Sequence, residues 1–392
     1  MPRHKSTEEE FAPLSQWRLI WRRFKRHKIG MLGAILTAFL FFALLFAEFI
    51  SPYNPNVSQT FPYKDRERSY TNTPPARIHF FSDEGFSIRP FVYGLTFVPS
   101  CPRCTPRVFN ERYEEDQTKK YFIKLFARGD EYYFWGLFKT NLHLFGVEEP
   151  GKLFLFGSDG MGRDLFSRTL VGGRITLAIG LIVIVVSFML GIPLGGLSGY
   201  YGGKTDTIIQ KLIEVIMGLP RLALLLALSG VLSTFKIEPI VRFWAIALMI
   251  AFVSWAPLAR VIRGQFLALR EEDFITAAKA LGASDMRVIL KHILPNTMSF
   301  LVVTATLTIP NVIILESTLS FLNYGIRPPM MSWGMLLFDA QNKLLEVLQS
   351  YPWYLIPGGF IIVTVLIFNF LGDALRDAVD PFTVAAVKEE KI

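Results

Sequence analysis

The chain has 392 residues, with 41 Lys and Arg against 33 Asp and Glu, a formal net charge of +8 and a mean hydropathy of +0.36. Only 19% of the residues are charged and 51% are hydrophobic, whereas a soluble domain carries roughly 25% charged residues. This composition argues against an ordinary soluble enzyme, and the 14% aromatic content argues against a disordered chain. The basic balance would suit nucleic acid, but cytoplasmic Lys and Arg of a membrane protein give the same balance, and we expect no nucleic-acid partner.

Six apolar segments approach the roughly 20 residues that a helix needs to cross a bilayer. They are residues 29–47, 175–203, 206–235, 243–259, 297–315 and 354–372. The third segment contains Lys211, Glu214 and Arg221, and the fifth contains Pro310. A single segment could be a buried helix of a large soluble protein, but six in one chain favour an all-α integral membrane protein. The first segment is longer than the roughly 7–15 apolar residues of a signal peptide.

Basic residues near the ends of the segments predict the orientation in the membrane. Six of them precede the first segment: Arg18, Arg22, Arg23, Lys25, Arg26 and Lys28. The loop 260–291 between the fourth and fifth segments is also basic. We therefore expect a multi-pass protein of the cell (inner) membrane with both termini in the cytoplasm. We divide the chain into a basic cytoplasmic segment (1–28), a first transmembrane helix (29–50), an external insertion (51–157), a transmembrane core (158–373) with a cytoplasmic loop (264–295), and a cytoplasmic tail (374–392).

The external insertion has the composition of a small module that is mostly β. Residues 77–81, 86–97 and 121–126 are rich in β-branched and aromatic residues, and residues 128–130 have the composition of a hairpin turn. Cys101 and Cys104 form a C-x-x-C sequence, which is compatible with a redox pair, half of a zinc site or a structural disulfide. With no second cysteine pair, we favour a loop-closing disulfide or two unpaired thiols, and we predict no metal site.

The cytoplasmic loop begins with a predicted short helix at residues 271–282. Asp273 is a candidate N-cap, and Gly282 is a suitable C-terminal stop. The spacing i, i+3, i+4, i+7 places four apolar residues on one helix face: Phe274, Ala277, Ala278 and Leu281.

A second predicted helix follows, with Ser284 or Asp285 as its cap. Its apolar residues are Met286, Ile289, Leu290 and Ile293, and Pro295 opens the fifth membrane segment at a permitted position. Two amphipathic helices at the membrane surface suit either a docking site for another protein or a connector that lies flat on lipid. Spacing alone does not decide between these alternatives.

The loop resembles the EAA loop of ABC importer permeases, in which E-A-A, a glycine and an I-x-L-P ending follow at fixed spacing. Ala277, Ala278, Gly282 and Leu294-Pro295 match, whereas Thr276 replaces the glutamate and His292 replaces the isoleucine. Other segments resemble the oligopeptide/dipeptide branch of that family. They include Gly157-Ser158-Asp159, Gly162-Arg163-Asp164, Gly199 to Gly203, Glu316 to Leu322 and Ser332-Trp333-Gly334. The resemblance covers residues 14–55 and 153–382.

The resemblance implies a six-helix fold of the type I ABC importer permease kind and a function in binding-protein-dependent import of oligopeptides or dipeptides. The implied partners are a second permease subunit, two ATP-binding cassette subunits, an external substrate-binding protein and membrane lipid. ATP would be bound by the partner subunits, and this chain would be neither an enzyme nor a cofactor protein. Seven residues would contact the ATPase: Phe274, Thr276, Ala277, Ala278, Leu281, Gly282 and Ala283.

Three ionisable residues at membrane depth are candidates for lining a translocation path: Glu214, Arg221 and Glu316. Glu214 and Arg221 are seven residues apart and would share a face of the third helix. A structural ion pair or an orientation toward the membrane surface is the favoured alternative for this pair.

Three other functions remain as alternatives. The same class of importer also carries nickel or oligosaccharides. A passive channel or secondary transporter would not explain the two-helix loop, and we find no inverted repeat. A membrane-anchored receptor would not explain six segments with internal prolines. Gly203-Lys204-Thr205 resembles the end of a P-loop, but Ser198 stands where its first glycine is required.

Overall fold

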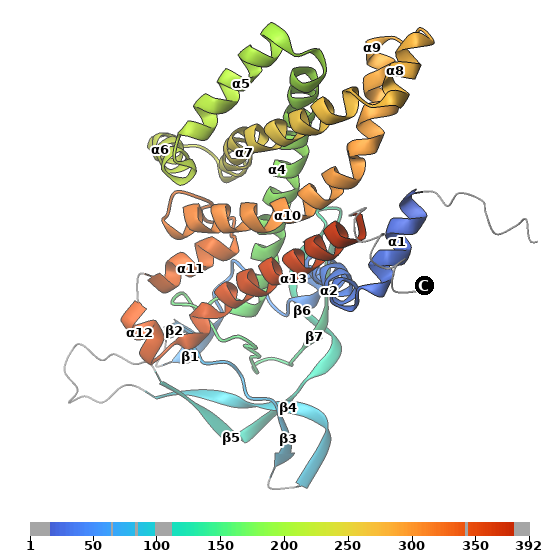
Figure 1. Ribbon diagram of the computed structural model, residues 1–392. Helices are drawn as coiled ribbons and strands as arrows, with labels where there is room; N and C mark the ends of the chain where they lie inside the picture. The colour runs from blue at the N-terminus through green and yellow to red at the C-terminus, as the bar shows by residue number, and fades with distance from the viewer. Residues whose placement is uncertain (1–15, 64–65, 83–84, 99–111, 342–343, 380–392) are drawn as a thin grey trace, which may run out of the picture.

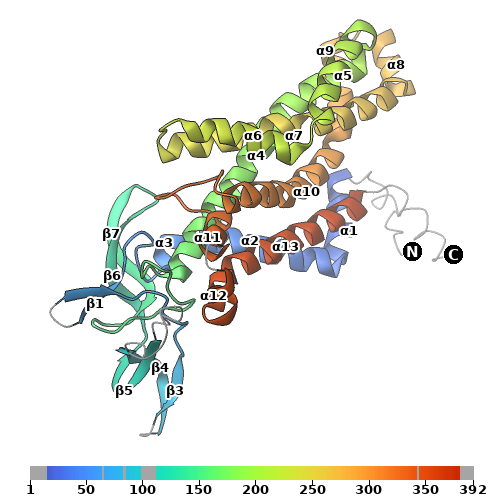
Figure 2. The same ribbon diagram turned by 90° about the vertical axis from the view of Figure 1, so that its left-hand side faces the viewer.

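The computed structural model describes residues 16–63, 66–82, 85–98, 112–341 and 344–379. A bundle of helices carries a β module at one end (Figures 1 and 2). The helices are α1 (Gln16–Arg26), α2 (Lys28–Leu45), α3 (Ala47–Ile50), α4 (Leu165–Tyr201), α5 (Gly203–Gly218), α6 (Arg221–Thr234), α7 (Pro239–Arg270), α8 (Asp273–Ala280), α9 (Asp285–Val288), α10 (Leu294–Phe321), α11 (Trp333–Gln341), α12 (Leu344–Gln349) and α13 (Ile356–Val379).

Five helical segments in the described part of the chain are long and apolar enough to cross a membrane, and a bent pair makes a sixth. The five include α2, α4, α7 and α13, together with the continuous segment that runs through α9 and α10. The bent pair is α5 and α6, which meet at an angle of 81°. This count confirms the predicted all-α membrane architecture, with the third span broken.

The break in the third span has a local cause. Leu219 is extended, with φ −88° and ψ 137°, and the next residue is Pro220. A proline disfavours the helical conformation of the residue before it, so the helix ends and starts again at Arg221. Because the axis turns here, Glu214 and Arg221 lie on different helices, and the prediction that they share one helix face is wrong.

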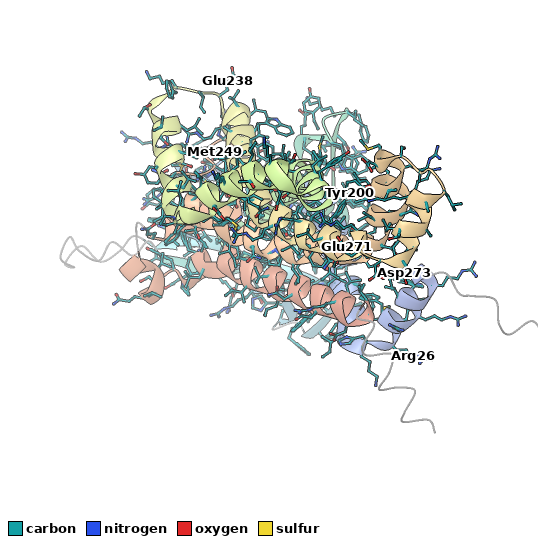
Figure 3. All side chains as sticks on the ribbon, turned by 45° about the horizontal axis from the view of Figure 1, so that its top comes forward. Arg26, Tyr200, Glu238, Met249, Glu271 and Asp273 are labelled. Carbon is teal, nitrogen blue, oxygen red and sulfur yellow. The ribbon has the colours of Figure 1, made fainter. Side chains whose placement is uncertain are left out.

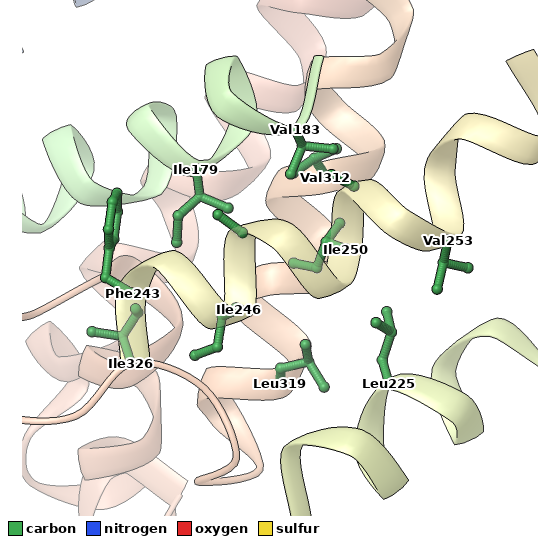
Figure 4. Packing of buried hydrophobic residues seen from close by; sticks show 12 residues of the cluster. Ile179, Val183, Leu225, Phe243, Ile246, Ile250, Val253, Val312, Leu319 and Ile326 are labelled. Atoms are coloured by element: carbon green, nitrogen blue, oxygen red, sulfur yellow. The ribbon is translucent and has the colours of Figure 1, made fainter. Parts of the chain in front are cut away.

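The centre of the helical part is a dry cluster shared by α4, α6, α7 and α10. Figure 4 shows Val183 of α4, Ile250 of α7 and Val312 of α10 in contact across the cluster, and all three side chains are fully buried. Leu225 brings the short helix α6 to the same cluster. Because lipid tails are as apolar as these side chains, close van der Waals packing in this cluster is what holds the broken span against its neighbours.

Glycines of α4 allow α7 to pack unusually close. A Cβ atom at Gly195 would lie 2.4 Å from the carbonyl oxygen of Ala259, and one at Gly199 would lie 2.6 Å from that of Arg263. Small residues at this spacing let two helix backbones approach in a membrane. The contact extends to the last turn of α4, next to the 264–295 loop.

The described residues of the β module form three antiparallel sheets. Their strands are β1 (Thr60–Tyr63) with β2 (Arg66–Ser69), β3 (His79–Ser82) with β4 (Gly85–Val98) and β5 (Arg112–Phe122), and β6 (Lys124–Phe134) with β7 (Phe138–Gly146). The module confirms the predicted small β insertion. The predicted turn at 128–130 is wrong, because these residues lie within β6 at an irregularity of the β6–β7 register.

The turn of the last hairpin lies instead at Trp135-Gly136. Both residues have positive φ, 50° and 72°, and the Leu137 amide donates to the Phe134 carbonyl at 2.9 Å. These are the features of a type I′ turn, whose twist matches that of the two strands. Trp135 occupies the first central position of this turn, where Asn, Asp or Gly is usual, so the sequence pattern does not predict a turn here.

A buried ionic cluster joins the β module to the start of α4. Asp159 is 2% exposed and accepts hydrogen bonds from Arg163 Nε at 2.7 Å and from the buried Arg168. Trp353 also reaches this junction, because its Nε1 donates to the Ser158 carbonyl at 3.1 Å. The segment 157–168 therefore connects the module to the start of α4 and to the residues just before α13.

Candidate functional site

The loop between α7 and α10 contains two short helices at the end of the helical part opposite the β module (Figures 1 and 2). Helix α8 begins after Glu272, which is its N-cap residue, so the assignment of Asp273 as N-cap is wrong. Asp273 is the first helical residue, where its carboxylate still lies at the positive end of the helix dipole. Helix α9 begins after Ser284, and neither helix has a side-chain hydrogen bond at its N-cap.

The end of α8 is a Schellman motif centred on Gly282. The Gly282 amide donates to the Lys279 carbonyl at 2.9 Å, and the Ala283 amide donates to the Ala278 carbonyl at 3.1 Å. Gly282 has φ +83°, a conformation that side chains disfavour. The glycine stop predicted from the sequence is confirmed, and it sets the angle between the two short helices.

The second helix differs from its prediction beyond Val288. A π-helical turn, Ile289–Ile293, joins α9 to α10 without a break. The wider turn changes the register, so Ile293 is buried whereas Met286 and Leu290 are exposed. The predicted apolar face of this helix is therefore divided between the core and the surface.

Three buried residues anchor the loop to the membrane helices. Ile275, Val288 and Ile293 are fully buried in a cluster with residues of α4, α7 and α10. Tyr200 adds a polar contact, because its hydroxyl donates to Asp285 Oδ1 at 2.6 Å. The Lys279 ammonium lies 4.9 Å from the centroid of the Tyr200 ring. Figure 3 labels Tyr200, Glu271 and Asp273 in neighbouring parts of the view.

The face of α8 singled out from the sequence points away from this anchor. Phe274 is 42% exposed and Leu281 is 90% exposed, while Ile275 between them is fully buried. Ala277 and Thr276 are also exposed, and Ala278 is half-buried. We call the residues Phe274, Thr276, Ala277, Ala278, Leu281, Gly282 and Ala283 the loop surface. It presents apolar side chains on an element that buried residues anchor, and exposed apolar patches of this kind mark interaction sites.

An ion pair behind the loop was not identified from the sequence. Arg263 of α7 donates from Nε and Nη2 to the two carboxylate oxygens of Asp206 on α5, each at 2.6 Å. Ser198 of α4 donates to the same carboxylate. Arg270 donates to the carbonyl oxygens of Gly199 and Tyr200 at 3.3 and 3.4 Å. These contacts connect the C-terminal part of α7, which leads into the loop, to the last turn of α4 and the first turn of α5.

The three residues predicted at a translocation path are not brought together. Glu214 is exposed on α5. Arg221 is half-buried at the start of α6 and donates to Ser254 of α7. Glu316 is fully buried and accepts hydrogen bonds from Ser320 Oγ at 2.7 Å and Thr176 Oγ1 at 3.4 Å. The surroundings of Glu316 indicate a role in packing α10 against α4. Cys101 and Cys104 lie outside the described residues.

Comparison with known proteins gives two family matches. The family described as "Binding-protein-dependent transport system inner membrane component" matches residues 191–384, and the family described as "N-terminal TM domain of oligopeptide transport permease C" matches residues 15–75. Residues 76–190, which contain most of the β module, lie between the two matches.

Three curated relatives align with this chain over most of their own length. An oligopeptide transport system permease protein of Bacillus subtilis is 37% identical over 66% of this chain and 80% of its own. A dipeptide transport system permease protein of the same organism is 39% identical over 58% and 70%. An oligopeptide transport system permease protein of Escherichia coli is 41% identical over 58% and 72%.

Proposed function

The chain belongs to the family of binding-protein-dependent transport system inner membrane components, and we propose that it is a permease subunit of a peptide importer driven by partner ATPases. The observation that supports this role most directly is the 264–295 loop. It combines buried anchors, a Schellman stop and an exposed apolar surface at one end of a bundle of membrane spans. The identity of 37–41% to oligopeptide and dipeptide permeases supports a peptide as the transported substrate.

In this proposal the loop surface binds an ATP-binding subunit, and ATP is bound by that partner. Movement of the ATPase pushes α8, and the buried Ile275 and the Asp206–Arg263 pair transmit the displacement to α4, α5 and α7. A rigid connection is needed because a flexible loop would absorb the displacement. Thr276 is exposed where other family members carry a glutamate, so docking relies on apolar contact more than on charge.

We also propose an assembly of two permeases, two ATP-binding subunits and an external substrate-binding protein. The basic helix α1 packs against the end of α13, and Figure 2 shows both α1 and the loop on the side of the helical part that faces away from the β module. Basic residues favour the cytoplasmic side, which supports cytoplasmic termini and an external β module. Of the three ionisable residues, the exposed Glu214 and the half-buried Arg221 remain our candidates for the path.

Co-purification with a matched pair of variants tests the proposal. Leu281→Asp places a charge on the loop surface, and Leu348→Asp places the same charge on α12, where Leu348 is 59% exposed. From mild detergent, the wild-type chain and Leu348→Asp should bring down a second permease and ATP-binding subunits. Leu281→Asp should retain the permease and lose the ATPases. Equal recovery of ATPases with both variants would refute docking at this surface.

A further inference from the structure

The tip of the β6–β7 hairpin is an exposed aromatic segment. Residues 133–138, here called the aromatic tip, read Tyr-Phe-Trp-Gly-Leu-Phe. Tyr133 is 63% exposed, Trp135 46%, Leu137 76% and Phe138 56%. Four large apolar side chains exposed in so short a segment are unfavourable in water, because burying each would be worth about 1.5–3 kcal/mol.

The aromatic tip is held against the end of a membrane helix. Trp135 Nε1 donates to the carbonyl oxygen of Leu45, the last residue of α2, at 2.9 Å. The ring of Phe46 lies 5.8 Å from that of Phe134 and 5.6 Å from that of Trp135, measured between centroids. The hydrogen bond satisfies the indole N–H, so covering this ring with lipid leaves no unpaired donor.

The tip continues the outward surface of α2. Phe39, Phe42 and Leu45 are 68%, 59% and 50% exposed on this span. Phe42 also packs against Phe46, with ring centroids 4.6 Å apart, which joins the span to the aromatic tip. The exposed apolar side of α2 and the exposed side of the tip therefore form one apolar surface that crosses from a helix to a hairpin.

A second contact fixes the direction of the hairpin. Near its open end, the ring of Phe126 on β6 lies 6.3 Å from that of Phe49 on α3. Gly129 of β6 also lies close to the segment after α3, since a Cβ atom at this position would lie 3.2 Å from the Pro52 carbonyl oxygen. With contacts near both ends, the hairpin lies along α3 and presents its tip at the last turn of α2.

We propose that the aromatic tip is a lipid-binding element that inserts into the outer interfacial region of the bilayer beside α2. Trp and Tyr are enriched at this depth, because their rings prefer the apolar side while their polar atoms reach hydrogen-bonding groups. The ligand is the interfacial layer of a phospholipid bilayer. Its binding fixes the β module on the membrane surface and does not depend on transport.

The β3–β4 hairpin provides the contrast within the same module. Phe81, Phe86 and Ile88 are 72%, 64% and 87% exposed there, so its apolar exposure is as great. Both views show this hairpin at the far end of the module, away from the helices (Figures 1 and 2). Aromatic exposure by itself therefore does not place a hairpin in lipid, and the contact of the tip with α2 is the decisive observation.

Fluorine NMR of the full chain in phospholipid nanodiscs tests the proposal. The seven tryptophans are replaced by 5-fluorotryptophan, and Trp135→Phe identifies the signal of the tip. Phe86→Trp adds a matched probe on the β3–β4 hairpin. Each sample is measured with lipid that carries a doxyl group near the headgroup and, separately, with a water-soluble gadolinium chelate.

We expect the doxyl lipid to broaden the Trp135 signal more than the chelate does, and the reverse for the probe at position 86. Broadening of the Trp135 signal mainly by the chelate would place the tip in water and overturn the proposal. Broadening by neither reagent would mean that protein covers the tip, and would equally overturn it. Neither result depends on whether the chain transports peptides.

Discussion

Arg263 and Asp206 form a bidentate ion pair, with Nε and Nη2 of the arginine each 2.6 Å from one carboxylate oxygen. The pair connects α7 to α5, and its arginine immediately precedes the 264–295 loop in the sequence. The two side chains are only 30% and 20% exposed, so the geometry is protected from water on most sides. A paired, planar contact of this kind resists both rotation and sliding of the two helices.

Breaking this ion pair should lower the stability of the protein and also weaken the transmission of movement from the loop to the membrane helices. We expect Arg263→Gln to lower the free energy of unfolding by about 1–2 kcal/mol, since the pair is charge-assisted but partly solvated. Arg263→Lys should cause a smaller fall in the free energy of unfolding, because an ammonium keeps the charge but cannot make the bidentate contact. Thermal unfolding in detergent measures the effect. A double variant Asp206→Asn/Arg263→Gln that loses the sum of the two single effects would contradict a direct interaction.

Two glycine-to-alanine changes should have opposite signs. Gly282→Ala forces a side chain into φ +83° and should destabilise the protein by about 1–2 kcal/mol, although no described residue lies within 4 Å of the added Cβ. Gly264→Ala, inside α7 and also with no described residue within 4 Å of the added Cβ, should stabilise the protein by about 0.5–1 kcal/mol. Unfolding curves of the two variants make the comparison, and a common sign would argue against the Schellman geometry.

Substitutions at two neighbouring residues of α8 should distinguish the anchoring of the helix from the docking of the ATPase. Ile275→Ala removes a fully buried side chain and should cost about 2–5 kcal/mol of stability. Phe274→Ala changes a side chain that is 42% exposed, and should leave the unfolding midpoint nearly unchanged while it weakens ATPase binding. Unfolding and co-purification of both variants test this. Loss of ATPase from Ile275→Ala alone would place the docking surface elsewhere.

The N-cap of α4 should make stability depend on pH. Burial raises the pKa of Asp164 to about 7, and its Oδ1 atom has no hydrogen-bond partner among the described residues. Since the folded chain binds this proton more tightly than the unfolded chain, the stabilisation is complete below pH 4 and is lost as the pH rises through 7. Asp164→Asn, which keeps a capping oxygen, should remove this dependence. Parallel pH profiles for both proteins would contradict the assignment.

Glu316 should behave as a packing residue. It is fully buried and hydrogen-bonded to Ser320 and Thr176. Glu316→Gln keeps a group of similar shape and should retain transport per folded molecule. Glu316→Ala should destabilise the chain by about 2–5 kcal/mol, because it leaves a cavity and unpaired hydroxyl groups. Altered peptide selectivity in Glu316→Gln, with unfolding unchanged, would restore this residue to the translocation path.

Much of the architecture can be predicted from the composition of the chain and from the spacing of its apolar residues. The apolar segments, the β insertion and the glycine stop at 282 depend on local properties: the length that a bilayer requires, the residue types that suit strands, and the conformation that only glycine adopts without strain. Pro220 also marks the break locally in the sequence, but no local pattern gives the 81° angle between the two helices that separates Glu214 from Arg221.

The tertiary structure decided which side of each element is buried. The period of α8 placed Phe274 and Leu281 on one face, but only packing against α4, α7 and α10 shows that Ile275 is the anchor and that this face is exposed. The Asp206–Arg263 pair joins residues 57 positions apart, and Trp135 meets Leu45 across 90 positions. Such contacts arise from helix crossings and hairpin placement, which no local pattern of residues specifies.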